Sequence, residues 1–225
     1  MTLSNYRELI RNLPYLDQAF ETKKQSWQKQ IKKFRNFKEF CDERFEQNHS
    51  IKLSRRDLFV ATNNETFESA LYQIVFWGYP RNMRGNNLDE ILSRLPTIKK
   101  AFSPNHDLGE NDFQNVLSTL KGTHIGLSTL TKMLYFFNYR IDNYKCLILD
   151  SRLIEIIQSK VYMELLPLSK LSLHNKAAYY LEYVKIIAEL ADAQNYLEDQ
   201  LEFFLFHFGK NLKGGVASTA YKHGL

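Results

Sequence analysis

The stretch 120–134 reads Leu-Lys-Gly-Thr-His-Ile-Gly-Leu-Ser-Thr-Leu-Thr-Lys-Met-Leu, and it decides how the chain is interpreted. Gly122 and Gly126 separate a helix expected over 111–120 from a second helix expected over 129–138. Glycine permits positive φ and a close backbone approach to phosphate, and the amides that open the second helix favour an anion. The pattern predicts a helical hairpin that grips one DNA strand without reading its sequence. A plain glycine connector between two helices is the alternative.

Two polar residues after this hairpin stand in apolar surroundings. Lys132 lies one turn into the second helix among Leu, Tyr and Phe, where burial favours a neutral, nucleophilic amine. Asp150 ends the apolar run 146–149, where an unpartnered carboxylate is costly. Together they can cleave an N-glycosidic bond, because the amine can attack C1′ while the carboxylate stabilises positive charge on the sugar. The alternative is structural: Asp150 caps a helix over 151–162 and Lys132 extends its amine toward solvent.

Composition excludes several classes of protein. The chain has 225 residues, of which 44% are hydrophobic and 24% are charged, as is typical of a globular protein. No apolar stretch is long enough to span a membrane, and the first residues lack the pattern of a signal peptide. Cys41 and Cys146 stand alone, without the spacing of a disulfide scaffold or a zinc site. We therefore expect a cytoplasmic protein without metal or organic cofactor.

The positive charge is concentrated near the N-terminus. The net charge is +5, and residues 1–60 carry 13 basic and 8 acidic side chains, which accounts for the whole excess. Within the segment 22–38 there are seven basic residues and no acidic one, interleaved with Trp27, Phe34 and Phe37. Such a segment suits a polyanion such as DNA. A solvated helix face whose aromatic rings pack inward explains it equally well.

The rest of the chain is predicted to be mostly helical, so the expected fold class is all-α. Spaced apolar residues favour a helix across most of 17–47, and no part of the chain resembles a ladder of strands. The run 144–149 is either a buried strand or an extended connection. Breakers and periodicity place the other helices at 65–77, 88–95 (ended by Pro96), 174–192 and 195–210.

These motifs resemble those of the helix-hairpin-helix (HhH-GPD) DNA glycosylase superfamily. The resemblance is closer to bacterial proteins with an 8-oxoguanine DNA glycosylase-like fold, and it extends over roughly 65–210. Lys132 and Asp150, which are 18 residues apart, match the spacing of the catalytic lysine and aspartate of that family. The matching pieces are Leu120-x-Gly122-x-x-Ile125-Gly126, Ser128-x-x-x-Lys132-x-Leu134-x-Phe136 and Ile148-Leu149-Asp150-Ser151-Arg152-Leu153.

The resemblance implies a two-lobed helical fold, with DNA in a central cleft and the target base flipped out. It implies that Lys132 and Asp150 are catalytic. It also implies that the loop after Pro80 carries wedge residues, Asn82 and Arg84, which fill the place of the flipped base. The alternative for this loop is a polar connector whose asparagines cap the helix over 88–95. The residues expected to contact DNA are Lys121, Gly122, Ile125, Gly126, Ser128, Arg152, Asn82 and Arg84.

Two departures from the family pattern bear on these assignments. In well-known members the lysine follows the second hairpin glycine by two residues, and that position is Ser128 here. Either Lys132 or Ser128 therefore occupies the catalytic position, and the spacing to Asp150 favours Lys132. The usual proline of the hairpin is Lys121 in this chain.

The resulting prediction is a monomeric DNA N-glycosylase that excises a damaged or modified base, with AP-lyase activity as an additional expectation. The base is an oxidised purine or, because related bacterial proteins occur among anti-phage defence genes, a modified phage base. A non-catalytic helix-hairpin-helix DNA-binding protein is the main alternative, and a helical protein–protein adaptor is another. The expected organisation is a basic segment over 1–60, a glycosylase-like core over 61–210 and a flexible tail over 211–225.

Overall fold

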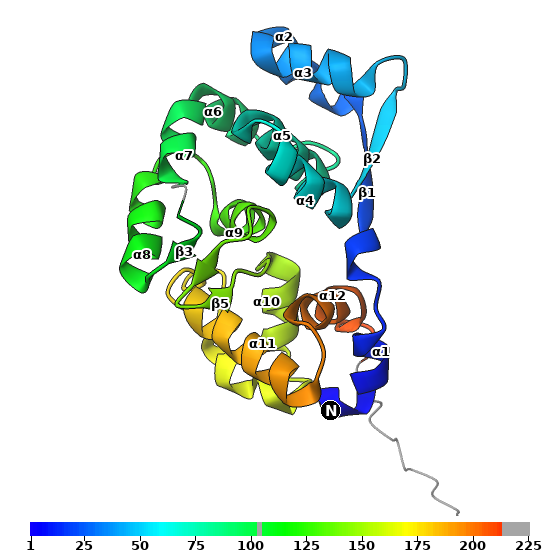
Figure 1. Cartoon of the computed structure of the whole chain (residues 1–225), viewed down its shortest axis with the longest axis vertical. Coiled ribbons are helices and arrows are strands. Elements are labelled where there is room, and N and C mark those ends of the chain that lie inside the picture. Colours follow the sequence, from blue (N-terminus) through cyan, green and yellow to red (C-terminus); the bar gives the residue numbers. More distant parts are fainter. Residues whose placement is uncertain (103–104, 213–225) are drawn as a thin grey trace, which may run out of the picture.

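The computed structural model describes residues 1–102 and 105–212, and this part of the chain is mostly helical, as predicted (Figure 1). The α-helices are α1 Arg7–Arg11, α2 Gln28–Lys33, α3 Arg35–Phe45, α4 Arg55–Asn64, α5 Phe67–Gly78, α6 Asn87–Ser93, α7 Leu95–Ala101, α8 Glu110–Thr119, α9 Leu127–Phe136, α10 Ser151–Gln158, α11 Tyr180–Gln194 and α12 Glu198–Phe208. Four 3-10 helices accompany them, η1 Leu3–Tyr6, η2 Tyr15–Asp17, η3 Lys24–Trp27 and η4 Met163–Lys170. The strands are β1 Ala19–Lys23, β2 Ser50–Ser54, β3 Asp107–Leu108, β4 Arg140–Ile141 and β5 Tyr144–Lys145.

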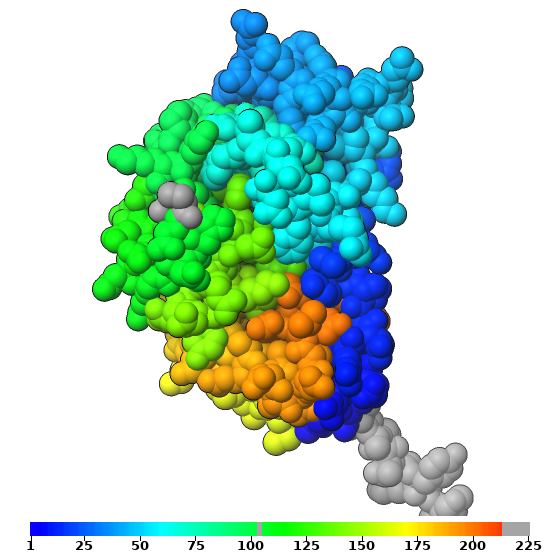
Figure 2. Space-filling model, in the orientation of Figure 1, coloured from blue at the N-terminus to red at the C-terminus, as the bar shows by residue number. Residues whose placement is uncertain are grey.

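The N-terminal segment is where the helical prediction was wrong. β1 and β2 form a five-residue antiparallel ladder that pairs Ala19 with Ser54 and Lys23 with Ser50. The backbone of Phe34 is extended, which separates α2 from α3. A ladder between strands this far apart depends on tertiary contacts, which local periodicity does not record. Figure 2 shows that α2 and α3 stand at one end of the molecule, beyond α4 and α5.

Helix α9 lies at the centre of the fold and is packed against both α4 and α5 (Figure 1). Every residue from 129 to 136 is buried, which is typical of a helix enclosed by protein on all sides. Helix α5 is also buried from 70 to 77, and the rings of Trp77 and Phe136 meet edge-on at 5.2 Å. The α9 backbone is therefore fixed by its neighbours, and its side chains are presented from a rigid element.

Several boundaries differ from the predicted ones for local reasons. Pro96 does not end a helix but lies in the first turn of α7, where the missing amide hydrogen costs nothing. In the run 144–149 only Tyr144 and Lys145 belong to a strand, and the remaining residues are extended. The helix expected from 174 begins at Tyr180. The tail expected over 211–225 lies outside the described residues from 213 onward.

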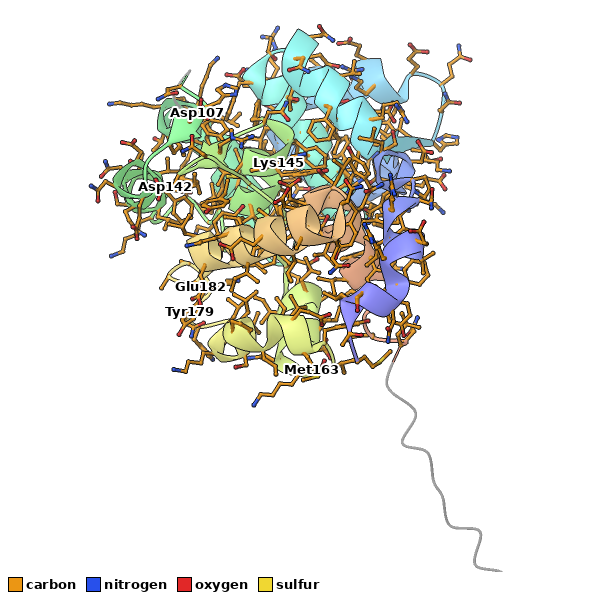
Figure 3. The ribbon with its side chains drawn as sticks, turned by 60° about the horizontal axis from the view of Figure 1, so that its bottom comes forward. Asp107, Asp142, Lys145, Met163, Tyr179 and Glu182 are labelled. Carbon is orange, nitrogen blue, oxygen red and sulfur yellow. The ribbon has the colours of Figure 1, made fainter. Side chains whose placement is uncertain are left out.

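The N-terminus is attached to the opposite end of the molecule from α2 and α3. The amide of Leu3 donates to Glu164 Oε1 at 2.7 Å, and the amide of Met163 donates to the carbonyl of Met1 at 3.0 Å. Met163 marks this end of the molecule in Figure 3. Because α1 contacts α12, the first 23 residues run along the side of the helical core before they reach α2. This path carries Gln18 and Phe20 past the centre of the molecule.

Candidate active site

The predicted hairpin is present between α8 and α9. Gly122 has φ +83°, a backbone conformation that residues with a Cβ rarely adopt. The buried hydroxyl of Thr123 donates to the carbonyl of Leu120 at 2.7 Å. Gly126 is extended and immediately precedes α9, so the first amides of that helix have no intrahelical acceptor. A surface hollow is formed here by the hairpin together with residues of α8 and Asn87. This geometry suits an anion such as a DNA phosphate.

Lys132 projects from the first turns of α9 and is 5% exposed. Its Nζ donates to the Ser128 hydroxyl at 2.8 Å and to the Ser128 carbonyl at 3.2 Å. The amine also lies 5.4 Å from the centre of the Tyr79 ring. The alkyl chain passes beside Gly78, where an added Cβ would lie 2.9 Å from Lys132 Cδ. The lysine is thus held on three sides and does not extend along the surface.

The extended run before Asp150 is held by side chains in place of strand partners. The hydroxyl of Tyr180 bonds to both backbone groups of Leu147, and the hydroxyl of Tyr183 donates to the carbonyl of Ile148 at 3.0 Å. The amide of Leu149 donates to Thr131 Oγ1 at 3.1 Å, which ties the run to α9. Because these contacts satisfy the buried backbone, no neighbouring strand is needed.

Asp150 caps helix α10, as the structural alternative for this residue predicts. Its Oδ1 accepts the amide of Leu153 at 3.0 Å. The start of a helix favours negative charge, so the carboxylate is stabilised at this position. Because the cap uses Oδ1, the second oxygen remains for other contacts. Capping and lining a cavity are therefore compatible roles for this residue.

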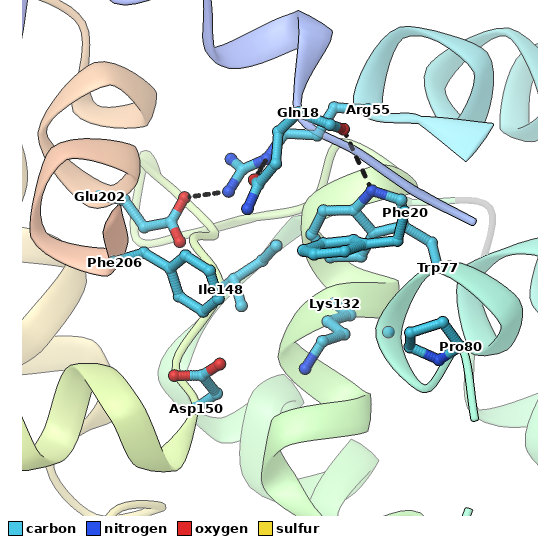
Figure 4. A pocket seen from close by; sticks show the side chains of 11 residues that line it. Gln18, Phe20, Arg55, Trp77, Pro80, Lys132, Ile148, Asp150, Glu202 and Phe206 are labelled. Atoms are coloured by element: carbon cyan, nitrogen blue, oxygen red, sulfur yellow. Dashed lines mark hydrogen bonds and ion pairs between the residues drawn. The ribbon is translucent and has the colours of Figure 1, made fainter. Parts of the chain in front are cut away.

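Lys132 and Asp150 line the same cavity, which has a volume of about 210 Å³. Figure 4 shows their charged ends pointing into it from α9 and from the start of α10. Ligand pockets for drug-sized molecules span about 300–1,000 Å³, so this one suits a smaller group. Its apolar wall consists mainly of rings and an isoleucine: Phe20, Trp77, Pro80, Ile148 and Phe206.

A buried ion pair forms the polar end of this cavity. Arg55 Nη2 lies 2.6 Å from Glu202 Oε2, and both side chains are 1% exposed. Glu202 Oε1 has no hydrogen-bond partner among the described residues, although it is buried. Burial raises the pKa of Glu202 to about 7, even though Arg55 opposes the shift. Burial lowers the pKa of Arg55, but its interactions with Glu202 and Tyr135 outweigh this effect and leave that pKa raised.

Further hydrogen bonds fix the position of Arg55. Its Nε donates to Gln18 Oε1 at 2.6 Å, and its Nη1 donates to the Tyr135 hydroxyl at 3.1 Å. That hydroxyl donates to Asp199 Oδ1 at 2.6 Å, and Lys145, labelled in Figure 3, donates to Asp199 Oδ2 at 2.6 Å. The network joins Gln18, immediately before β1, to α4, α9, α12 and β5, so it holds this end of the cavity rigid.

The two candidate wedge residues in the loop after Pro80 differ in their surroundings. The side-chain amide of Asn82 donates to the carbonyl of Ser26 at 2.8 Å and to Gln30 Oε1 at 3.1 Å. Asn82 also has φ +79°. Its side chain therefore anchors the loop to the N-terminal segment, whereas Arg84 is exposed.

The remaining predicted contacts lie at different places. Lys121, Gly122, Ile125 and Gly126 line the hollow at the hairpin. Arg152, on α10, lies over the Phe206 ring at 4.8 Å, and its Nε is buried without a hydrogen-bond partner among the described residues.

Sequence reasoning missed Gln18, Arg55 and Glu202. A signal existed only for Glu202, which interrupts the apolar run from Leu201 to Leu205; a charge there indicates a buried partner. The partner itself is 147 residues away, and nothing in the pattern around Arg55 identifies it. Phe206, one of several phenylalanines near the C-terminus, also lines the cavity.

Two searches for other features gave negative results. Residues 1–102 and 105–212 contain no group of three His, Cys, Asp or Glu side chains placed to hold a metal ion. Within the same residues, no helix has the length and apolar character that crossing a bilayer requires.

The comparison with protein families matched the chain to a glycosylase family. The family described as "Putative 8-oxoguanine DNA glycosylase OGG-like protein" matches residues 14–206 of the chain. This range includes the hairpin and every residue that lines the cavity. Neither the search of curated proteins nor the search of solved structures found a match.

Proposed function

Because the chain belongs to this OGG-like glycosylase family, we propose that it is a DNA N-glycosylase that takes a flipped base into the cavity beside Lys132 and Asp150. The observation that carries the proposal is the shared cavity, which places an amine and a carboxylate next to a wall of rings. An enzyme that acts on a base within duplex DNA must extrude it into such a pocket. The rings of Trp77 and Phe206 are suited to contact the base.

The chemistry assigned to the pair follows from their charges. Attack of the neutral Lys132 amine on C1′ forms a C–N bond and breaks the glycosidic bond, whose electron pair leaves with the base. The amine then gives up a proton, and the departing base takes one. The Asp150 carboxylate, held at the start of α10, stabilises the positive charge that develops on the sugar. Ring opening to a Schiff base would permit β-elimination at the 3′ phosphate, which is the AP-lyase step.

The hairpin supplies the grip on DNA in this proposal. Lys121 and the open amides at the start of α9 bind a backbone phosphate near the flipped nucleotide. Of the two wedge candidates in the loop after Pro80, Arg84 is the exposed one, so it is the better candidate, and Asn82 supports the loop from inside. In this arrangement the duplex lies in a cleft between two lobes, with the cavity at its base.

The substrate proposed is an oxidised purine, the kind of base for which the family is described. A modified base of a phage genome, as in anti-phage defence, is the second candidate. Glu202 Oε1 favours a base that presents an N–H group, because that oxygen has no other partner among the described residues. Guanine-type purines and cytosines with a free amino group both meet this requirement.

The test is base release under single-turnover conditions from duplexes that carry oxidised purines or modified cytosines. Wild-type protein is expected to release at least one of these bases. Asp150→Asn removes the negative charge near C1′ and is expected to slow release by about 100-fold or more. Because an asparagine can still cap α10, DNA affinity and thermal stability should change little. Release at the wild-type rate by Asp150→Asn would remove Asp150 from the mechanism.

A further inference from the structure

The side chain of Lys132 is hydrogen-bonded to Ser128 of the same helix. Ser128 lies four residues before Lys132, so both residues are on the same face of α9. The Lys132 amine reaches back one turn and donates to both oxygens of Ser128, at 2.8 Å to the hydroxyl and 3.2 Å to the carbonyl. Both acceptors belong to a single residue, which fixes the direction of the amine as well as its position.

We propose that Gly78, Tyr79 and Ser128 form a cradle that positions the Lys132 amine with its lone pair directed into the cavity. This inference rests on the proposed function, because it concerns the same nucleophile. A neutral amine has two N–H groups and one lone pair. The two hydrogen bonds to Ser128 use both N–H groups, so the lone pair must point away from that residue. Lys132 lines the cavity, and this is the side on which the lone pair emerges.

The other two residues of the cradle complete it. The Tyr79 ring, whose centre lies 5.4 Å from Nζ, covers another side of the amine. Gly78 leaves room for the lysine chain, since a Cβ there would approach Cδ to 2.9 Å and Cε to 3.1 Å. A side chain at position 78 would therefore push the middle of the lysine chain away from Ser128. Ser128 thus positions the Lys132 amine. From the sequence, the two residues had been alternatives for one catalytic position.

The first test is borohydride trapping on DNA with a ready-made abasic site, followed as a function of pH. Ser128→Ala removes the closer acceptor and is expected to lower the trapping rate roughly 10- to 100-fold, because a misdirected nucleophile loses its alignment. It should also move the pH midpoint of trapping, which is measured at saturating DNA because Ser128 is also an expected DNA contact. Ser128→Thr restores the hydroxyl and should recover most of the rate. Gly78→Ala is also expected to lower the trapping rate, because its methyl group would push the Lys132 chain away from Ser128.

Thr62→Val is the matched control. It removes a hydroxyl that also bonds to α9, but at the other end of the helix, where it donates to the carbonyl of Phe136 at 2.9 Å. Its trapping rate and pH midpoint should match the wild type. If Ser128→Ala traps at the wild-type rate with an unmoved midpoint, or if Thr62→Val is impaired to the same degree, the cradle is wrong.

A second measurement separates the cradle from the proposed function. Trace acetylation across a pH range, with mass spectrometry of the peptide that contains Lys132, reports the reactivity of the amine without any DNA. Ser128→Ala should shift this reactivity profile, and Thr62→Val should not. If wild-type protein forms no adduct with abasic DNA but the profile shifts, the lyase chemistry fails and the cradle stands. An unshifted profile overturns the cradle whatever the adduct result.

Discussion

Glu202 is the residue whose surroundings most constrain what the cavity can bind. One carboxylate oxygen faces Arg55, and the other is buried without a hydrogen-bond partner among the described residues. A buried acceptor left unpaired is costly, so a ligand that brings a donor gains affinity that a ligand without one does not. The cavity should therefore discriminate among bases by their N–H groups more than by their size.

Glu202→Gln tests this reading of the cavity. If the new carbonyl oxygen stays on Arg55, the side-chain NH₂ group faces the donors of the base, and release of the base should slow by roughly 10- to 100-fold. Trapping on DNA with a ready-made abasic site should fall much less, because no base has to be held. The measurement is the ratio of these two rates.

Glu198→Gln is the control for that experiment. Glu198 lies on the same helix, one turn before Glu202, but it neither lines the cavity nor belongs to the network around Arg55 described above. An equal loss of both rates in Glu202→Gln, or the same ratio in Glu198→Gln, would contradict a role for Glu202 in holding the base.

At this scale the sequence identified residues whose chemistry depends on local context. Lys132 and Asp150 could be found because each is an ionisable group that interrupts an apolar stretch, and the cavity does contain both. Arg55 lies in a polar segment, and its burial results from contacts with Gln18, Tyr135 and Glu202, which are distant in the chain. Patterns along the sequence do not contain that information.

Among the elements, α4 and α12 are joined by the Arg55–Glu202 pair, which makes their packing sensitive to pH. The folded-state pKa of Glu202 is about 7, raised by burial above its ordinary value of 4.5. The folded protein therefore binds this proton more tightly than the unfolded chain does. The resulting stabilisation is fully present below about pH 4.5 and is lost as the pH rises through about 7.

Urea unfolding of the wild type and Glu202→Gln at pH 5 and pH 8 measures this linkage. The free energy of unfolding of the wild type, relative to that of the variant, should be smaller at pH 8 than at pH 5. Titrating groups distant from Glu202 contribute to both proteins alike, so the difference between the two proteins reports Glu202 together with its charged neighbours Arg55, Asp150 and Asp199. A difference that is the same at both pH values would mean that Glu202 does not titrate in this range.

Helices were predictable where their own residues determine them. Helices α5, α8, α9 and α10 appear within a few residues of their expected bounds, because breakers or caps mark their ends. The ladder between β1 and β2 was not predictable, since each strand is stabilised by a partner distant in the chain. Pro96 was misread because a proline can end one helix or open the next, and the packing of α7 decides between the two.

On the scale of the whole molecule, the N-terminal segment contributes residues to the candidate site. Gln18 and Phe20, which precede the basic stretch, line the cavity that contains Lys132, and Arg55 joins them at the start of α4. The family match, which begins at residue 14, includes this contribution. The sequence had suggested only a basic surface for this segment. The cavity is assembled from six regions of the chain, and folding brings them together around α9.

The central claim is that this assembled cavity performs glycosylase chemistry with Lys132 as its nucleophile. The most direct test is borohydride trapping of wild type and Lys132→Gln on duplexes with an abasic site or a modified base. We predict a covalent adduct for the wild type that disappears in Lys132→Gln, while DNA binding is retained. An adduct of equal yield in Lys132→Gln would contradict the assignment. DNA binding without adduct or base release across the panel would instead support a non-catalytic helix-hairpin-helix protein.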